Sequence, residues 1–335
     1  MRYIGSKLSL LDFIYESITS VVGNNTNMIF ADLFAGTGAV GRYFKQKGYS
    51  VISNDLQYYS YIINKHYIEN IDTFDLNKYT YLNELKAPAD IKTAFIYNNY
   101  CMGSGSQRNY FTNENGLKCD AIRQEIEQLY NNKEINESEY ICLLASLIES
   151  VDKCANTTSV YGAFLKHIKS GAQKTFSYDI LPLEKGLKGQ VYNENANDLI
   201  KHIKGDILYL DPPYNARQYS SNYHILETIA RYDNPEIKGK TGLRDYSKQK
   251  SDFCSVKTAE QALEDIIQNA NFKYIFLSYN NEGLISTERI KEIMEKYGKY
   301  QVFTKEYKRY KADKEENRNY KANTTTEYLH CLIKD

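Results

Sequence analysis

The sequence has no tryptophan, only five prolines, and no two cysteines at a spacing typical of metal ligands. Its six cysteines, at positions 101, 119, 142, 154, 254 and 331, form no C-x-x-C motif, which argues against a zinc site or a redox motif. We therefore expect reduced thiols in a cytoplasmic protein. No apolar run approaches the roughly 18 residues of a membrane span, and the N-terminus has no signal-peptide pattern. These absences argue against contact with a membrane.

The formal net charge is zero as well, because 42 Lys and Arg balance 42 Asp and Glu. Without a global field, the chain can attract a polyanion only through local basic patches. What is present is an ordinary soluble composition, with 42% hydrophobic and 25% charged residues. The length of 335 residues allows one large domain with an insertion, or two domains. The 32 tyrosines suit base stacking, but we attribute them more to codon bias.

The central motif is a short apolar run that ends in Asp211, Pro212, Pro213 and Tyr214. The run, Ile207 to Leu210, is typical of a buried strand, and the charge and the double proline stop it at Asp211. In open α/β sheets, ligands bind at the carboxyl ends of the strands. We therefore expect these four residues to lie at a ligand-binding edge.

The chemistry of this motif suits an amino group on a flat ring. Asp211 and the rigid carbonyl of Pro212 are two acceptors beside the ring of Tyr214. Each acceptor can take one N–H of an exocyclic NH2 group while the ring stacks on the base. Such bonds would localise the nitrogen lone pair and favour attack on an electrophile, mainly in the transition state. The alternative is a Pro-Pro turn with an incidental Asp and a surface Tyr.

A glycine-rich turn follows a second buried strand, Met28 to Leu33. Gly36 and Gly38 permit a tight strand-to-helix turn and a close approach of the backbone to a ligand. The next strand, Val51 to Asp55, ends in an acid that can take both ribose hydroxyls of a nucleoside-like cofactor. The alternative for Asp55 is a turn or a helix N-cap.

Three motifs now stand in a diagnostic order: Phe-Ala-Gly-Thr-Gly at 34–38, Asn-Asp at 54–55 and Asp-Pro-Pro-Tyr at 211–214. Over most of its length the chain resembles the Dam-like branch of DNA adenine-N6 methyltransferases, and within it the methyltransferases paired with type II restriction endonucleases. The resemblance implies an α/β, Rossmann-like fold with seven strands, mostly parallel with a C-terminal hairpin. It implies methyl transfer from S-adenosylmethionine to N6 of an adenine flipped out of double-stranded DNA. It implies no metal, and a cognate restriction endonuclease that acts separately; we expect a monomer.

The same resemblance assigns roles to individual residues. Cofactor contacts fall on the methionine-side residues, the turn, the ribose acid and the acid at the cofactor's adenine: Tyr3 and Lys7; Asp32, Phe34, Ala35, Gly36 and Gly38; Asp55; and Asp198. The motif Asp211 to Tyr214 would bind the target adenine. Tyr3 stands where relatives often have Trp, which preserves a ring.

The segment 73–187 separates the two parts of the expected catalytic domain, 1–72 and 188–335. Its helical patterns predict a mostly helical insertion, and the resemblance implies target recognition there. Candidate DNA contacts are basic and aromatic residues in this insertion and after the catalytic strand: Arg108, Tyr110, Arg123, Arg217, Tyr219, Tyr223, Lys248, Lys250, Lys308 and Arg309. For each of them the alternative is a solvated face or core packing.

Three other functions remain open at this point. A cytosine-N4 methyltransferase attacks a similar amine, and only the resemblance favours adenine through Asp at position 211. An RNA or protein-glutamine methyltransferase would reuse the motif but explains the large insertion less well. The third is a non-catalytic DNA-binding protein with a decayed cofactor pocket. A cytosine-C5 enzyme is disfavoured, since none of the six cysteines follows a proline.

Overall fold

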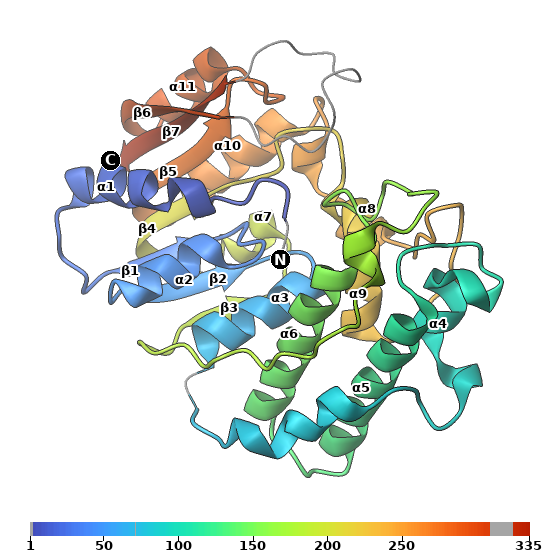
Figure 1. The fold of residues 1–335 in the computed structure, drawn as a ribbon. Helices are drawn as coiled ribbons and strands as arrows, with labels where there is room; N and C mark the ends of the chain where they lie inside the picture. Colours follow the sequence, from blue (N-terminus) through green and yellow to red (C-terminus); the bar gives the residue numbers. More distant parts are fainter. Residues whose placement is uncertain (1–2, 71, 309–323) are drawn as a thin grey trace. The chain divides into compact units, whose positions relative to one another are not determined.

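The computed structural model describes residues 3–70, 72–308 and 324–335 (Figure 1). In this part of the chain seven strands form one sheet in the order β3-β2-β1-β4-β5-β7-β6. The strands are β1 (Ile29–Asp32), β2 (Ser50–Asn54), β3 (Gln190–Tyr192), β4 (Lys204–Leu210), β5 (Asn271–Asn280), β6 (Gly298–Lys308) and β7 (Thr324–Lys334). Strands β3, β2, β1, β4 and β5 are parallel, whereas β7 is antiparallel to both β5 and β6. The predicted seven-stranded α/β fold with a C-terminal hairpin is confirmed.

The chain forms two compact units. The sheet unit contains Ser6–Leu56, Gly186–Gln218 and Lys250–Asp335, and the helical unit contains residues 3–5, Gln57–Lys185 and Tyr219–Gln249. These units differ from the division expected at residues 73 and 187. The reason is that α3 (Tyr58–Asn64) and α9 (His224–Arg231) bury their apolar side chains in one core with the inserted helices.

Helices cover both faces of the sheet in the sheet unit. Side chains alternate between the faces along each strand. On one face Phe30 of β1 stacks on Phe44 of α2, with ring centroids 3.8 Å apart. On the other face Ala31 and Leu208 share a core with α7, α10 and α11. The helices of this unit are α1 (Leu11–Val22, after a 3-10 turn at Leu8–Leu10), α2 (Ala39–Gln46), α7 (Ala196–Leu199), α10 (Ala259–Asn269) and α11 (Thr287–Glu295).

The helical unit is built around two long helices, α5 (Asn113–Asn131) and α6 (Glu137–Cys154). Thr112 caps α5, and Asn136 and Glu139 form a capping box at the start of α6. These caps satisfy first-turn N–H groups of both helices. Shorter helices complete the unit: α3 with a π turn at Lys65–Glu69, α4 (Phe95–Tyr100), α8 (Tyr219–Asn222) and α9.

Two global properties complete the description. Among the helices of the described residues, none combines the length and the apolar character needed to cross a membrane. All six cysteines are free and buried.

Candidate active site at the carboxyl edge of the sheet

Three strand ends meet at one edge of the sheet unit. Strand β1 lies between β2 and β4, and its Asp32 is opposite Ser53 on β2 and Tyr209 on β4. Because the three strands are parallel, their carboxyl ends lie at the same edge. The chain segments that leave this edge carry the glycine-rich turn, Asp55 and Asp211.

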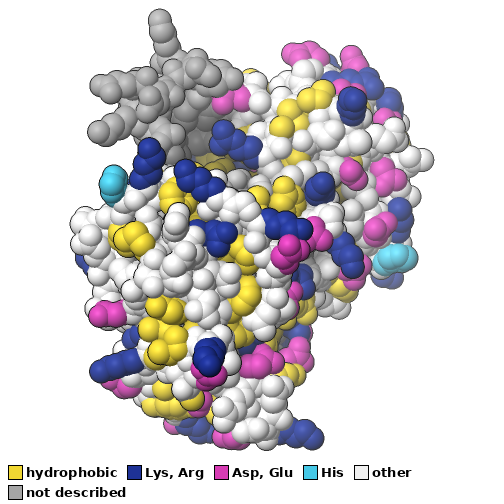
Figure 2. Space-filling model, turned by 90° about the vertical axis from the view of Figure 1, so that its right-hand side faces the viewer, with side chains coloured by type: hydrophobic (Ala, Val, Ile, Leu, Met, Phe, Trp, Pro, Cys, Tyr) yellow, Lys and Arg dark blue, Asp and Glu magenta, His cyan; other side chains and the backbone are white. Residues whose placement is uncertain are grey.

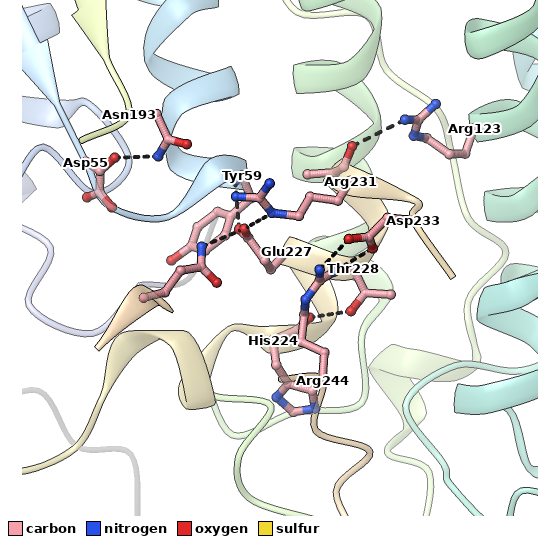
Figure 3. A network of polar contacts seen from close by, with 12 residues as sticks. Asp55, Tyr59, Arg123, Asn193, His224, Glu227, Thr228, Arg231, Asp233 and Arg244 are labelled. Atoms are coloured by element: carbon pink, nitrogen blue, oxygen red, sulfur yellow. Dashed lines mark hydrogen bonds and ion pairs between the residues drawn. The ribbon is translucent and has the colours of Figure 1, made fainter. Parts of the chain in front are cut away.

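The glycine-rich turn is tied to the end of β2. Ala35 N donates to the Asn54 carbonyl at 2.9 Å, and Gly36 N donates to Asp55 Oδ2 at 2.8 Å. Gly36 and Gly38 have φ angles of 52° and 75°, a backbone region that strains other residues. Asn193 Nδ2 in turn donates to the Asp55 carbonyl at 2.7 Å (Figure 3). The half-buried carboxyl of Asp55 is thus fixed beside the glycine-rich turn.

Asp32 has an unused acceptor beside this turn. Its side chain is 1% exposed, and Oδ1 has no hydrogen-bond partner among the residues that the structure describes. Burial raises the pKa of Asp32 well above its usual value, and the charges of Asp211 and Asp55 add to the effect. A buried acceptor without a donor favours a ligand that brings a donor or a positive charge. The acceptors of Asp32 and Asp55 beside the turn therefore fit a cationic nucleoside cofactor.

Asp211 directly follows β4 and is paired with a buried lysine. Lys7 Nζ lies 3.2 Å from Asp211 Oδ1 and 2.7 Å from Glu327 Oε1. Burial alone would lower the pKa of Lys7, but the two carboxylates raise it well above its usual value. Burial raises the pKa of Asp211 to about 6; Lys7 opposes this rise and Glu327 adds to it. Asp211 therefore becomes fully ionised only above that pH.

The rest of the motif presents an acceptor and a ring. No hydrogen bond within the described part of the chain ends on the Pro212 carbonyl oxygen. The Tyr214 carbonyl accepts from Leu284 N at 3.1 Å, which fixes the loop, and the Tyr214 ring packs edge-on against Tyr279 with centroids 6.4 Å apart. Tyr214 remains partly exposed. Asp211, Pro212 and Tyr214 thus retain the functional groups on which the amine-binding hypothesis depends.

Glu327 and Ser278 also lie at this edge, although no sequence motif indicated them. Ser278 on β5 follows Leu277, the partner of Leu210 on β4, so it lies level with Asp211. Ser278 Oγ donates to Glu327 Oε1 at 2.5 Å. The signal that could have identified Glu327 is an acid directly before the mostly apolar residues 328–333.

Asp198 lies in α7, after β3. Its side chain is 73% exposed, and its Oδ1 is 3.7 Å from Lys201 Nζ. Asn195 caps the same helix by accepting from Asn197 N. The contact of Asp198 with the cofactor's adenine stays a prediction.

Tyr3, Tyr219 and Tyr223 come together in the helical unit. The Tyr3 ring stacks on Tyr223 with centroids 4.6 Å apart and lies 5.5 Å from Tyr219. Ile4 N donates to the Tyr223 hydroxyl at 2.7 Å. Tyr223 is fully buried, so core packing explains its position. Tyr3 and Tyr219 are partly exposed and stay candidates for ring contacts.

Two of the candidate DNA contacts are buried inside the helical unit. Arg123 is 2% exposed and donates to the carbonyls of Ile229 and Ala230 at 3.1 and 3.3 Å, and to Glu127 at 2.7 Å. Tyr110 is also buried, and its hydroxyl donates to the Tyr161 carbonyl. In this conformation neither side chain can contact DNA. Both belong to the core of the helical unit, in agreement with the alternative interpretation.

Arg108 and Glu227 are also hydrogen-bonded within the helical unit. Arg108 Nη1 and Nη2 each donate to a backbone carbonyl, of Asn99 and Gly239, at 2.9 Å. The buried Glu227 carboxylate accepts from Tyr59 N at the start of α3 and from Arg231 Nε (Figure 3). Gln249 Nε2 adds a third donor to Glu227. These contacts stabilise the unit and leave Arg108 only partly exposed.

The remaining candidates are Arg217, Lys248, Lys250, Lys308 and Arg309. Arg217, Lys248 and Lys250 are exposed. Lys308 ends β6 at the carboxyl edge of the sheet, and Arg309 lies outside the described residues. On the face drawn in Figure 2, basic and acidic side chains are interspersed over much of the surface. Any DNA contact there therefore depends on a few local residues, as the zero net charge predicts.

Comparison with known proteins agrees with this geometry. Residues 3–293 match the model of the family described as D12 class N6 adenine-specific DNA methyltransferase. The chain is 52% identical to the type II methyltransferase M.NlaIII of Neisseria lactamica, across 100% of this chain and 99% of that protein. It is 36% identical to M.CviAII of Paramecium bursaria Chlorella virus 1, across 91% of each chain.

A third relative is longer. The type II methyltransferase M.FokI of Planomicrobium okeanokoites is 42% identical across the whole of this chain, which corresponds to 53% of that protein. The match with the family model covers far more than half of the residues, including the turn at Gly36, Asp55 and Asp211. The chain therefore belongs to the D12 class of N6-adenine-specific DNA methyltransferases, which use S-adenosylmethionine.

Proposed function

We propose that this DNA adenine methyltransferase modifies N6 of an adenine within one short recognition sequence, as the modification enzyme of a type II restriction-modification system. The relatives M.NlaIII and M.CviAII, named as type II methyltransferases and matched over most of their length, support this assignment. A cognate endonuclease would act separately on unmodified sites. The enzyme is expected to work as a monomer in the cytoplasm.

The observation that carries the proposal is the placement of Asp211 at the same strand edge as Asp55 and the glycine-rich turn. In this arrangement a base bound by Asp211 and a nucleoside bound by Asp55 would use the ends of β4 and β2, which have only β1 between them. Direct transfer between two ligands requires them to be held side by side. The sheet order supports the proposal, because β1, which leads into the glycine-rich turn, is the one strand that separates β2 from β4.

The cofactor would be held by the chain's acids and its turn. Asp55 would accept from the ribose hydroxyls, and the free Oδ1 of Asp32 would face the positively charged methionine part. The backbone at Gly36 and Gly38 allows close approach because no Cβ is present. When bound, S-adenosylmethionine supplies an electrophilic methyl group on a sulfonium.

The target adenine would be held by Asp211, Pro212 and Tyr214. Extruding it from the duplex costs a few kcal/mol, which stacking on Tyr214 and two hydrogen bonds would offset. Asp211 and the Pro212 carbonyl would each accept one N6–H and direct the nitrogen lone pair. The pKa of Asp211, raised to about 6, also makes its carboxylate a suitable acceptor for the proton that N6 loses.

DNA recognition would use the helical unit and exposed basic residues. Arg217, Lys248 and Lys250 are exposed and can reach phosphates. The inserted segment, 73–187, would read bases, but Arg123 and Tyr110 are not among the proposed contacts because they are buried.

The function can be tested by expressing the chain in a host that lacks adenine methylation. Mapping modified bases genome-wide by single-molecule sequencing is expected to show N6-methyladenine at one recurrent short sequence. The same host with Asp211→Ala provides the matched control and is expected to show none. Modification at cytosine N4, or no recurrent sequence, would refute the proposal.

A further inference from the structure

Glu327 lies at the beginning of a strand that runs against its neighbour. Strand β7 is antiparallel to β5, and Glu327 is opposite Asn280 at the carboxyl end of β5. The beginning of an antiparallel strand lies at the same edge as the ends of the parallel strands. Glu327 therefore reaches the edge at which β4 delivers Asp211. It lies outside residues 3–293 that the family model matches.

At this edge Glu327 is buried between two donors. Its side chain is 1% exposed, and Oε1 accepts from Ser278 Oγ at 2.5 Å and from Lys7 Nζ at 2.7 Å. The distance from Lys7 Nζ to Asp211 Oδ1 is longer, at 3.2 Å. The shortest polar contact of Lys7 thus goes to Glu327 rather than to Asp211.

This arrangement bears on how well Asp211 can accept from a base. A carboxylate that is fully paired with an ammonium is a weaker acceptor for another donor. Asp211 Oδ1 lies 3.2 Å from Lys7 Nζ, and among the described residues no partner of Oδ2 is found. We propose that Glu327 is a positioning residue that holds Lys7 so that Asp211 keeps one oxygen for the adenine amino group. This inference rests on the proposed binding of adenine by Asp211.

The charges around Asp211 are consistent with this role. Burial raises the pKa of Asp211, Lys7 lowers it and Glu327 raises it further. The charge of Asp211 also raises the pKa of Asp32 at the end of β1, and the pKa of the buried Tyr209 on β4 is raised chiefly by burial and then by Asp211. An amide in place of the Glu327 carboxylate would therefore lower the pKa of Asp211 and strengthen its pairing with Lys7.

Glu327→Gln tests the inference because it removes the charge and keeps the shape. We expect kcat for DNA methylation to fall about 10- to 100-fold, less than for loss of a direct contact. The KM for DNA and the Kd for S-adenosylmethionine are expected to change less than about threefold. The acid limb of the kcat profile is expected to move to lower pH. An unchanged kcat with an unmoved acid limb would overturn the inference.

The matched control is Glu306→Gln, an exposed glutamate on the neighbouring strand β6. It is expected to leave kcat and the pH profile unchanged. Lys7→Met provides a second background, in which Glu327→Gln is expected to change kcat by less than about twofold. Equal losses in both backgrounds would show that Glu327 does not act through Lys7.

A variant that leaves both charges in place covers the case in which Glu327→Gln does not fold. Ser278→Ala removes one donor to Glu327 and is expected to lower kcat by a smaller factor, without loss of thermal stability beyond that of an ordinary surface change. Wild-type kcat in a folded Ser278→Ala protein would then overturn the inference. The proposed function fails separately, if the wild-type chain itself does not methylate adenine.

Discussion

The two units differ in how the carboxyl groups buried in them are hydrogen-bonded. In the helical unit Asp120 accepts from Ile96 N, Tyr97 N and the Tyr232 hydroxyl, so both carboxyl oxygens are used. In the sheet unit Asp32 is equally buried but has a carboxyl oxygen without a donor among the described residues. Both acids have a raised pKa, chiefly because of burial. Burial and a shifted pKa therefore do not separate structural from functional acids; the unused acceptor does.

The basic residues show the same contrast. The guanidinium of Arg123 donates hydrogen bonds to two carbonyls and to a glutamate of its own unit. Lys7 has one ammonium shared by two carboxylates, which leaves a local excess of negative charge. An excess of that sign suits a cationic ligand. The comparison predicts that substitutions at the sheet edge affect chemistry, whereas those in the helical core affect stability.

The largest expected effect is at Asp211. Asp211→Ala removes the acceptor proposed to act in the transition state, so methylation is expected to fall by at least about 100-fold. Cofactor affinity, measured by calorimetric titration, is expected to survive within a few-fold. Asp206→Asn is the control, because Asp206 lies on the same strand but bonds to Ile29 N at the opposite edge. Wild-type turnover in Asp211→Ala would remove this residue from the mechanism.

The second-largest effect is expected on the free energy of unfolding. Arg123→Ala leaves the Ile229 and Ala230 carbonyls without their buried donor, which is expected to reduce the free energy of unfolding by about 2 kcal/mol. Denaturant titration measures this loss. DNA affinity at a temperature where the variant is folded is expected to match the wild type. If affinity drops while stability is unchanged, Arg123 belongs to the DNA interface and the contrast between the units fails.

The smallest effect is expected on DNA binding, from substitutions of exposed lysines. Lys248→Glu with Lys250→Glu is expected to weaken DNA binding and to reduce the slope of log affinity against log salt by about 1 to 2 units. Lys204→Glu with Lys299→Glu, two exposed lysines at the starts of β4 and β6, is the control for net charge. An equal loss in both pairs would mean that overall charge decides binding rather than this loop.

Much of the fold could be predicted because apolar runs and their breakers are local signals. Strand β4 ends where Asp211 and two prolines interrupt the apolar run, and the glycines at 36 and 38 mark the turn into α2. The helix α10 was not predicted, although its buried residues recur at helical spacing. Local signals also placed the ends of β1, β2 and β4 at one edge, since parallel strands share their direction.

The remaining features depend on contacts between distant parts of the chain. Arg123 is a plausible DNA ligand in sequence, and only its carbonyl partners more than 100 positions away, at Ile229 and Ala230, give it a structural role. Lys7 was expected at the cofactor's methionine part, but its carboxylate partners, Asp211 and Glu327, lie more than 200 positions later in the sequence. No local pattern encodes such pairings.

The position of β7 has a consequence for how the protein is made. In the chain β7 follows β6, yet in the sheet it lies between β5 and β6. During synthesis the exposed edge of β5 must therefore stay unpaired until β7 has left the ribosome, and a bare strand edge invites pairing with other chains. Since β7 also carries Glu327, the pairing of β7 with β5 would complete the sheet and bring Glu327 to Lys7 in the same step.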